Sequence, residues 1–192
     1  MITGILLAAG RGTRFGSQKL LARLSDGRYD GRYVIEASAA NLLAAVGRVI
    51  AVTGRDERLM RVLDDCGCQV IVNERAAEGM GTSIGAGVGA SRTADGWIIA
   101  LGDMPFLQSS TIEKIKLALE EGATIALPTH EGRRGHPVGF ARQYGGVLSA
   151  LEGDTGAKAI IDANIASARM VEVSDTGIFA DIDVVGDLAR LS

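Results

Sequence analysis

Short and almost wholly apolar segments alternate along this chain with longer segments of helical character. The apolar segments occupy residues 2–8, 48–53, 69–72, 96–101, 124–127 and 169–173. Strands so short and so continuously apolar are typical of parallel sheets that are covered on both faces. Helical patterns occupy residues 34–46, 56–66, 109–121, 155–164 and 184–191. The alternation predicts a doubly wound α/β fold, with a mostly parallel sheet between two layers of helices.

The composition is that of an ordinary globular protein. The chain has 192 residues, 47% hydrophobic and 22% charged, with 26 glycines and 3 prolines. No repeat or linker interrupts it, so we expect a single domain spanning residues 1–192. The net charge of −3 gives no overall basic footprint, and we expect no nucleic-acid partner. The absence of a membrane-length apolar run and of a basic leader predicts a soluble, cytoplasmic protein without a membrane partner.

The two cysteines, Cys66 and Cys68, are separated by one residue. This spacing lacks the second ligand pair of a zinc site and is poorly suited to a disulfide bridge. We expect two reduced thiols where a helix turns into a strand.

The first apolar segment runs directly into a glycine-rich, basic loop. Residues 6–19 read L-L-A-A-G-R-G-T-R-F-G-S-Q-K, with three glycines and three cations. Glycines allow backbone N–H groups to approach an anion closely, and the cations supply positive charge. The segment therefore predicts a phosphate-binding loop.

Two common phosphate-binding templates do not fit this loop. Gly10, Gly12 and Gly16 give G-x-G-x-x-x-G, which is one residue longer than the dinucleotide-binding G-x-G-x-x-G. No acidic residue that could bind a ribose ends the second apolar segment, which disfavours an NAD-binding oxidoreductase. Lys19 is followed by Leu20 instead of Ser or Thr, so the P-loop template also fails.

A second motif, G-D-M-P at residues 102–105, follows the apolar segment 96–101. Open α/β sheets bind ligands beyond the carboxyl ends of their strands, where Asp103 would lie. Mg²⁺ prefers oxygen ligands and is commonly held by few carboxylates together with phosphates. An aspartate before a proline is also a common turn residue, and taken alone the motif favours neither interpretation.

Taken together, the motifs resemble those of the molybdenum cofactor nucleotidyltransferases, the MobA-like NTP transferase family, and most of all its cytidylyltransferases. The first loop fits A-A-G-x-G-x-R-x-G-x-x-K, and G-D-M-P follows. Three further matches come in order: G-M-G-T-S-I at 79–84, R-G-H-P-V-G-F at 134–140 and G-D-T-G-A-K at 153–158. D-I-D at 181–183 is similar to the family's last motif, although Val184-Val185-Gly186 replaces its T-P-E. The resemblance implies a three-layer, Rossmann-like nucleotidyltransferase fold.

The resemblance also implies roles for individual residues. The catalytic residues would be Arg14, Lys19 and Asp103, with the two cations on the phosphates of the nucleotide. Mg²⁺ would be held by Asp103 and by Asp181, which we favour over Asp183. Residues 79–84 would form a loop on the nucleotide side, and nucleotide contacts would come from Leu7, Ala8, Ala9, Gly10, Arg11, Gly12, Thr13, Ser83 and Gly102. Acceptor contacts would come from Arg134, His136, Asp154 and Lys158.

The implied reaction moves a nucleoside monophosphate onto a phosphate monoester. The implied acceptor is a pterin phosphate, molybdopterin or its molybdenum form, with a molybdoenzyme or chaperone as protein partner. Ala9 favours CTP, because glycine at this position would leave more room for a purine. GTP, another phosphorylated acceptor or a non-catalytic cofactor-binding chaperone are the alternatives.

The sequence alone leaves two alternatives for the roles of some residues. We expect His130 to be structural, whereas Arg133 and Arg134 suit either a solvated turn or an acceptor phosphate. Gly85, Gly87 and Gly89 suit either close helix packing or approach to the nucleotide. The polar insert at 24–32 suits either a flap or a plain surface loop.

Overall fold

The computed structural model describes residues 1–10, 19–25, 29, 31–154 and 156–182. A mixed sheet forms its centre, in the strand order β3-β2-β1-β4-β7-β5-β6, with β8 paired to β5. The strands are β1 (Ile2–Ala8), β2 (Val49–Thr53), β3 (Gln69–Val72), β4 (Gly96–Leu101), β5 (Ile125–His130), β6 (Arg133–Arg134), β7 (Val138–Ala141) and β8 (Arg169–Glu172). The helices are α1 (Val34–Val46), α2 (Glu57–Asp65), α3 (Met80–Gly89), α4 (Ser109–Glu120), α5 (Gly145–Ser149) and α6 (Lys158–Ala163).

Most strand pairs are parallel, which confirms the predicted α/β class. The parallel pairs are β1 with β2, β1 with β4, β2 with β3 and β5 with β8. Strand β7 is antiparallel to both β4 and β5, so these two neighbours run in the same direction. The carboxyl ends of β1, β4 and β5 therefore meet at one edge of the sheet, which we call the carboxyl edge.

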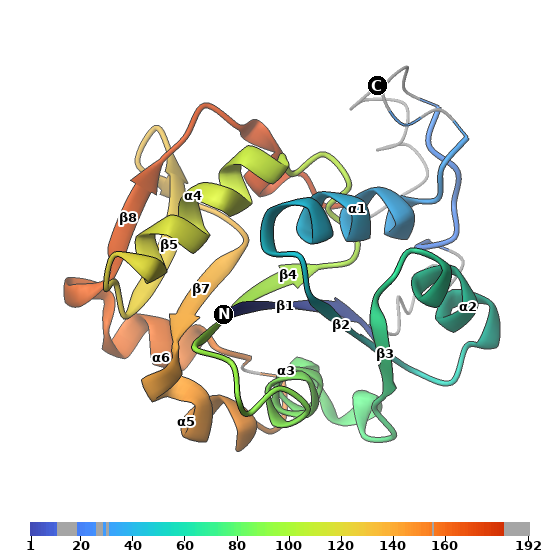
Figure 1. Cartoon of the computed structure of the whole chain (residues 1–192), viewed down its shortest axis with the longest axis horizontal. Helices are drawn as coiled ribbons and strands as arrows, with labels where there is room; N and C mark the ends of the chain where they lie inside the picture. Colours follow the sequence, from blue (N-terminus) through green and yellow to red (C-terminus); the bar gives the residue numbers. More distant parts are fainter. Residues whose placement is uncertain (11–18, 26–28, 30, 155, 183–192) are drawn as a thin grey trace.

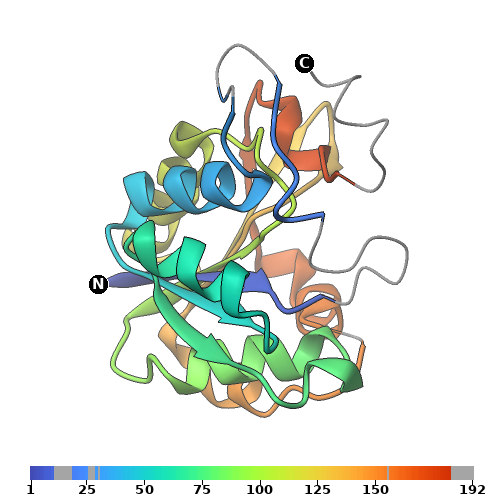
Figure 2. The same ribbon diagram turned by 90° about the vertical axis from the view of Figure 1, so that its right-hand side faces the viewer.

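Helices cover both faces of the sheet (Figures 1 and 2). Helices α1, α2 and α4 lie on one face, whereas α3, α5 and α6 lie on the other. Strand β1 is almost wholly apolar because its side chains are buried on both faces of the sheet. Leu6 packs into the core beneath α1 and α4, whereas Ile5 packs into the core that α3 covers. Both side chains are fully buried, as the alternating faces of a central strand require.

Two elements escaped the sequence prediction. Residues 79–84 were expected to form a loop, but Met80 begins α3, in which Gly85 and Gly87 allow close packing. A Cβ on Gly85 would lie 3.1 Å from the Ser149 carbonyl oxygen, and one on Gly87 would lie 2.6 Å from the Ile5 side chain. Close packing is thus the role of these two glycines.

The second missed feature is the two strands β6 and β7, each of which is antiparallel to β5. These strands flank the segment G-H-P at residues 135–137 and contain or adjoin glycines. A Cβ on Gly139 would meet the Ile115 side chain at 2.8 Å, so the glycine allows α4 to pack tightly onto β7. Glycine weakens a strand pattern in sequence, and the packing that favours it here is non-local.

Helix ends show smaller differences from the prediction. Helix α6 begins at Lys158 instead of residue 155, and the helix expected at 184–191 lies outside the described residues. Helix α4 begins as predicted, but its first turn is capped from a distance. The buried Asp175 carboxylate accepts hydrogen bonds from the Gln108 N–H (2.9 Å) and the Thr111 hydroxyl (2.7 Å).

The described residues of the polar insert at 24–32 are anchored to the core. Leu24 and Tyr29 are buried, and the Tyr29 hydroxyl is hydrogen-bonded to the Asn41 side chain. Backbone hydrogen bonds join Leu24 to Gly31 and Arg32. The two described ends of this insert are therefore held together, and Tyr29 attaches the insert to α1.

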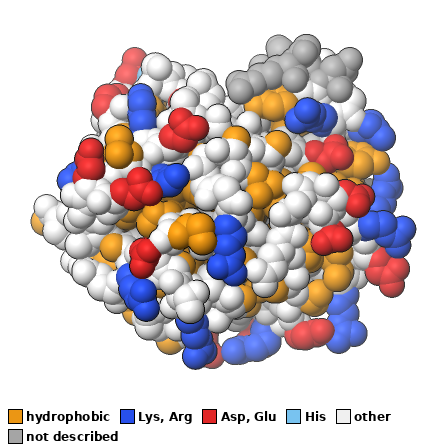
Figure 3. All heavy atoms as spheres, in the orientation of Figure 1, with side chains coloured by type: hydrophobic (Ala, Val, Ile, Leu, Met, Phe, Trp, Pro, Cys, Tyr) orange, Lys and Arg blue, Asp and Glu red, His pale blue; other side chains and the backbone are white. Residues whose placement is uncertain are grey.

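The surface mixes charges of both signs. On the face in Figure 3, basic and acidic side chains are interspersed among apolar ones. Cys66 caps the end of α2 and Cys68 precedes β3, and both are free thiols. Among the helices of the described residues, none has the length and apolarity that crossing a membrane would need.

Candidate active site

Three adjoining hollows follow the carboxyl edge of the sheet. The outer hollow, of about 760 Å³, lies between the end of β1 and the segments that follow β2 and β3, where it is lined by Ala8, Gly54 and Asn73. The central hollow, of about 540 Å³, is lined by Gly10, Ser83 and Asp103. The deep pocket, of about 420 Å³, is lined by Ile84, Phe140 and Lys158 among others. Shared residues join them: Ala9 and Gly10 line the first two, and Leu7 and Asp154 the last two.

The end of β1 supplies the wall between these hollows. Leu7 lines the deep pocket and the central hollow, Ala8 the outer hollow, and Ala9 with Gly10 both the outer and the central hollows. Ala8 and Ala9 are buried. The predicted phosphate-binding residues Arg11, Gly12, Thr13 and Arg14 lie outside the described residues.

Asp103 stands just beyond the end of β4 and faces Lys19. The Lys19 ammonium lies 3.0 Å from Asp103 Oδ2, and both side chains are mostly shielded from solvent. Asp103 Oδ1 is buried and has no hydrogen-bond partner among the described residues. A buried charged oxygen without a partner is costly, unless a bound group compensates it.

Gly102 allows the chain to turn tightly at this position. Its N–H donates to the Leu7 carbonyl at 2.9 Å, and a Cβ would lie 2.8 Å from the Ile35 side chain. Gly102 was predicted to contact the nucleotide. In the structure it also lets the end of β4 pack closely against β1.

Asp181 belongs to a segment that joins two parts of the site. The Ile182 N–H donates to the Asp103 carbonyl at 3.0 Å, and the His136 N–H donates to the Ile178 carbonyl at 3.0 Å. The Asp175 carboxylate fixes the beginning of the same segment through the Gly177 N–H at 2.9 Å. Residues 175–182 therefore bring Asp181 into the neighbourhood of Asp103 and His136. Asp183 lies outside the described residues.

The donor set fits a magnesium ion. Among the described residues, no three His, Cys, Asp or Glu are grouped so that they could hold a metal by themselves. The two acids expected from the sequence are Asp103 and Asp181. Mg²⁺ is usually held by one or two carboxylates, with waters and phosphates completing its shell. The partnerless Oδ1 of Asp103 is the observation that favours such an ion.

Ser83 lies in the first turn of α3 and lines the central hollow. Its hydroxyl accepts a hydrogen bond from the Asn73 amide at 3.0 Å, and the same amide donates to the Thr82 hydroxyl at 2.9 Å. Asn73, just beyond the end of β3, thus holds the start of α3 in place. Sequence reasoning missed Asn73, although a polar residue directly after an apolar strand was a usable signal.

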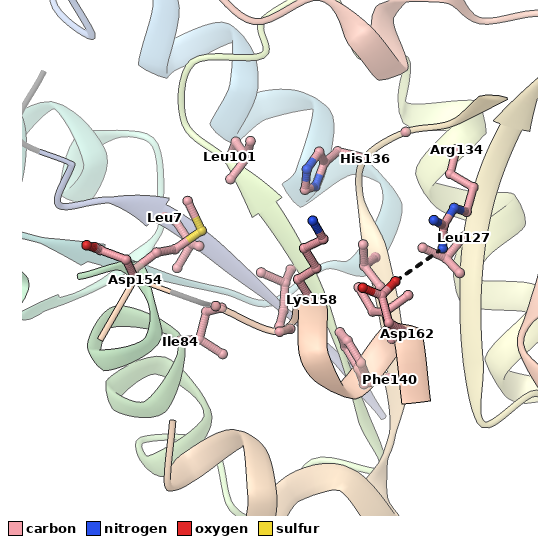
Figure 4. Close-up of a pocket in the computed structure, with 17 residues that line it drawn as sticks. Leu7, Ile84, Leu101, Leu127, Arg134, His136, Phe140, Asp154, Lys158 and Asp162 are labelled. Atoms are coloured by element: carbon pink, nitrogen blue, oxygen red, sulfur yellow. Dashed lines mark ion pairs between the residues drawn. The ribbon is translucent and has the colours of Figure 1, made fainter. Parts of the chain in front are cut away.

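The four residues predicted to bind the acceptor all line the deep pocket. Arg134 comes from β6, His136 from the segment before β7, Asp154 from the loop before α6 and Lys158 from α6. Figure 4 shows Lys158 extending toward His136, with Asp154 and Arg134 on opposite sides. The pocket walls are mainly apolar, with Ile84, Leu127, Val138, Phe140 and Ile161 among them.

His136 is largely enclosed, and its Nδ1 has no hydrogen-bond partner among the described residues. Burial lowers the pKa of His136, whereas the negative charges of Asp103 and Asp181 act to raise it. These influences indicate that His136 lies within electrostatic reach of both acids. His130 has a structural contact instead, because its Nδ1 is 2.8 Å from the Val173 carbonyl.

One further residue of the deep pocket, Asp162, escaped the sequence analysis, whereas Met80 belongs to the segment 79–84 that was expected to line the nucleotide side. Asp162 lies one helical turn after Lys158 and is ion-paired with Arg134 at 3.8 Å. That spacing of four residues on a helix could have identified it. Met80, an exposed thioether at the start of α3, lines both the deep pocket and the central hollow.

Known proteins resemble this chain along nearly its full length. Nicotine blue oxidoreductase of Paenarthrobacter nicotinovorans is 29% identical over 99% of this chain and 96% of that protein. Molybdenum cofactor guanylyltransferase of Cupriavidus metallidurans is 29% identical over 97% of this chain and 92% of its own length. The crystal structure of Rv0371c from Mycobacterium tuberculosis superimposes with a TM-score of 0.83, at 28% identity, over 99% of this chain and 96% of that one. A further structure of Rv0371c is a complex with manganese.

The family model of the MobA-like NTP transferase domain matches residues 4–170. This match covers most of the chain and agrees with the fold and with the order of motifs. The protein therefore belongs to the MobA-like NTP transferase family of nucleotidyltransferases.

Proposed function

We propose that this protein transfers CMP from CTP to the phosphate monoester of a pterin acceptor, molybdopterin or its molybdenum form, and releases pyrophosphate. The observation that carries the proposal is the position of Asp103. It faces Lys19 in the central hollow, which adjoins the end of β1 on one side and the deep pocket on the other. Two substrates could meet there, because Leu7 and Asp154 line both spaces.

The residues divide between the two substrates. The backbone at Ala9 and Gly10, continued by the loop 11–14, would hold the triphosphate, and Lys19 and Arg14 would balance its charge. Asp103 and Asp181 would hold Mg²⁺, which when bound would neutralise charge on the reacting phosphates. Lys158 and His136 would bind the acceptor phosphate from the deep pocket.

The reaction needs positioning more than a base. An oxygen of the acceptor phosphate forms a bond to the α-phosphorus of CTP, while the bond from that phosphorus to the bridging oxygen breaks and pyrophosphate leaves. A phosphate monoester has a second pKa of about 6 and is mostly dianionic near neutral pH. Its attacking oxygen therefore has no proton to lose, and charge balance with alignment supplies the catalysis.

Ala9 supports CTP as the nucleotide. It is buried and lines both the outer and the central hollows, so its methyl group narrows the space beside the end of β1. Ala9→Gly should raise the ratio of GTP to CTP use by about tenfold, the effect of one methyl group in a substrate pocket. An unchanged ratio would show that another residue selects the base.

The names of the relatives support the proposed acceptor and also suggest an alternative activity. The name of the Cupriavidus relative supports a molybdenum cofactor acceptor, although that protein is a guanylyltransferase. The Paenarthrobacter relative is named as an oxidoreductase, so a redox activity is the alternative to be tested. Non-catalytic delivery of a pterin to a molybdoenzyme or chaperone partner is the other.

The test uses the purified full chain with molybdopterin, Mg²⁺ and each of the four NTPs in turn. Pyrophosphate should be released, fastest with CTP, and release should stop when EDTA removes the metal. A parallel reaction contains NADH or NADPH in place of the NTP, together with an oxidised quinone or dye as the electron acceptor, and monitors oxidation of the nucleotide at 340 nm. If no NTP gives pyrophosphate, the proposal is overturned. Oxidation of the reduced nucleotide would then favour a redox enzyme. Binding of molybdopterin without either reaction would favour a carrier protein.

A further inference from the structure

A further hollow lies at the opposite edge of the sheet from the candidate active site. It has a volume of about 330 Å³ and lies between the end of α3, the start of β4 and helix α5. Trp97, the second residue of β4, lines it and pairs with Phe140 near the end of the antiparallel β7. We call it the amino-edge hollow. Among the described residues, none that lines it also lines the three hollows at the carboxyl edge.

Trp97 gives this hollow a rigid aromatic boundary. The residue is 1% exposed, and its Nε1 donates a hydrogen bond to the Ser91 hydroxyl at 2.9 Å. That hydroxyl donates in turn to the Gly87 carbonyl of α3 at 2.9 Å. Gly145 allows α5 to lie close to the indole, because a Cβ there would be 2.6 Å from Cη2 of Trp97. Helices α3 and α5 are thus held side by side around the ring (Figure 1).

Two arginines supply all the charge among the described residues that line the amino-edge hollow. Arg92 follows α3 and is exposed, and its side chain makes no hydrogen bond or ion pair within the described part of the chain. Arg142 follows β7 and lies 3.4 Å from the Asp95 carboxylate, with the two side chains 64% and 62% exposed. Asp95 is also paired with the Met1 ammonium. An ion pair so exposed adds little stability, so an anion could take Arg142 from Asp95 at small cost.

This charge matches a phosphate group better than a carboxylate. A guanidinium is always protonated and binds phosphate oxygens through two parallel hydrogen bonds. A phosphate monoester has a second pKa of about 6, so near neutral pH it carries almost two charges on one group. A carboxylate carries only one charge and would leave one of the two guanidiniums unbalanced.

The size of the hollow indicates a ligand with an organic part. Pockets that bind small molecules typically enclose about 300–1,000 Å³, and the amino-edge hollow falls within this range. Val88 and Trp97, both almost fully buried, line it beside the arginines. These two side chains offer an apolar surface on which the organic part of a phosphate ester can pack.

We propose that the amino-edge hollow is a separate binding site for a small phosphate monoester with a flat, apolar organic part. Arg92 and Arg142 bind the phosphate group, and Arg142 leaves Asp95 to do so. Val88 and Trp97 contact the organic part. The site is independent of the proposed transfer reaction, because its residues lie outside the hollows at the carboxyl edge.

The fluorescence of Trp97 tests this proposal directly, since it is the single tryptophan of the chain. The purified full chain is titrated with phenyl phosphate, benzoate and inorganic phosphate at constant ionic strength, and calorimetry in parallel detects any binding that leaves the fluorescence unchanged. Phenyl phosphate should bind at least about tenfold more tightly than benzoate, which has the same ring but one charge. It should bind about fivefold more tightly than inorganic phosphate, which has no ring to pack on Trp97.

Substitutions assign the binding to this hollow. Arg92→Gln should weaken binding of phenyl phosphate at least about tenfold, because a charged hydrogen-bond donor is lost. The matched control is Arg61→Gln, which changes another exposed arginine, on α2 and outside the hollow, and should alter the affinity less than about twofold. Asp95→Asn should bind at least as tightly as the wild type, because it removes a competitor for Arg142. Lys158→Gln, in the deep pocket, should leave the titration unchanged.

Several results would overturn the proposal. Failure of phenyl phosphate to bind in either measurement does so, as does an affinity that Arg92→Gln leaves within about twofold of the wild type. Loss of the Trp97 signal in Lys158→Gln would place the ligand in the deep pocket. Equal binding of benzoate would refute the phosphate group, equal binding of inorganic phosphate would refute the organic part, and weaker binding by Asp95→Asn would refute the role of Arg142. None of these outcomes bears on pyrophosphate release, because the titrations contain no nucleotide.

Discussion

The Lys19 ammonium contacts one oxygen of the Asp103 carboxylate at 3.0 Å, while the other oxygen is buried and has no partner among the described residues. The two oxygens of one carboxylate thus have different environments. The paired oxygen fixes the orientation of the side chain, and the second oxygen remains available for a cation brought in with the nucleotide.

Asp103→Asn should lower kcat for pyrophosphate release at least about 100-fold, because the site loses a negative charge that would hold the cation on the reacting phosphates. Circular dichroism should still report a folded chain. The control Asp64→Asn changes an exposed aspartate on α2 and should leave the rate unchanged. If Asp103→Asn keeps most of the wild-type rate, the metal assignment is wrong.

Gly79 joins the start of α3 to the loop before α6. Its φ is +124°, and a Cβ would lie 2.3 Å from the Gly153 carbonyl carbon. Gly79→Ala should therefore reduce the free energy of unfolding by at least about 2 kcal/mol, measured by urea denaturation.

Gly89, in the last turn of the same helix, is the matched control for Gly79. A Cβ there meets no atom within 4 Å, so Gly89→Ala should stabilise the protein by about 0.5 kcal/mol through helix propensity. A larger loss from Gly89→Ala than from Gly79→Ala would contradict the packing at both positions.

Asp175 ties the start of α4 to the segment that carries Asp181. It is 4% exposed and accepts hydrogen bonds from Gln108, Thr111 and Gly177. Asp175→Ala should reduce the free energy of unfolding by about 3 kcal/mol, because it leaves three donors, two of them buried, without their acceptor. Thr111→Val removes only one of these donors and should cost about 1 kcal/mol in the same chemical denaturation experiment. Similar losses for the two variants would argue against this network.

The buried thiol of Cys68 should make stability fall in alkaline solution. Burial, with a smaller contribution from Cys66, raises the pKa of Cys68 from 9.0 to about 12. The folded state therefore holds this proton when the unfolded state has lost it. The resulting stability is complete below about pH 9 and is lost as the pH rises from there toward 12.

Urea denaturation at pH 7.5, 9 and 10.5 measures this loss for the wild type and for Cys68→Ala. The variant should be less stable at pH 7.5, since a core side chain is shortened, but its stability should change less with pH. Burial also raises the pKa of Cys66, so Cys66→Ala should show a partial effect in the same direction. Equal slopes for wild type and Cys68→Ala would refute the assignment.

The sequence predicted the parallel half of the molecule well, because its determinants are local. β1 and β4 were predicted with the observed ends, and β2 within one residue, since each is buried on both faces and therefore almost wholly apolar. Asp103 could be placed at the carboxyl edge for the same reason, as it directly follows such a strand.

Non-local packing explains what the sequence did not predict. Glycines at 85 and 87 reduce the helix signal of α3, yet they allow the helix to approach Ser149 and Ile5. The cap of α4 comes from Asp175, which is far away in sequence from Gln108. The Arg134–Asp162 pair likewise joins a short strand to a helix that comes later in the chain.

Strand β7 runs opposite to its two neighbours β4 and β5, and this has a consequence for how substrate preference could diverge. Val138, its first residue, pairs with Ile99 near the end of β4, so the chain enters β7 at the edge where its parallel neighbours finish. Residues 134–136 and α6 can therefore change without disturbing β1 to β4, which would hold the nucleotide in the proposed reaction. A fold in which the two binding regions lie on different elements allows the acceptor specificity to change in evolution, while the elements proposed to bind the nucleotide stay the same.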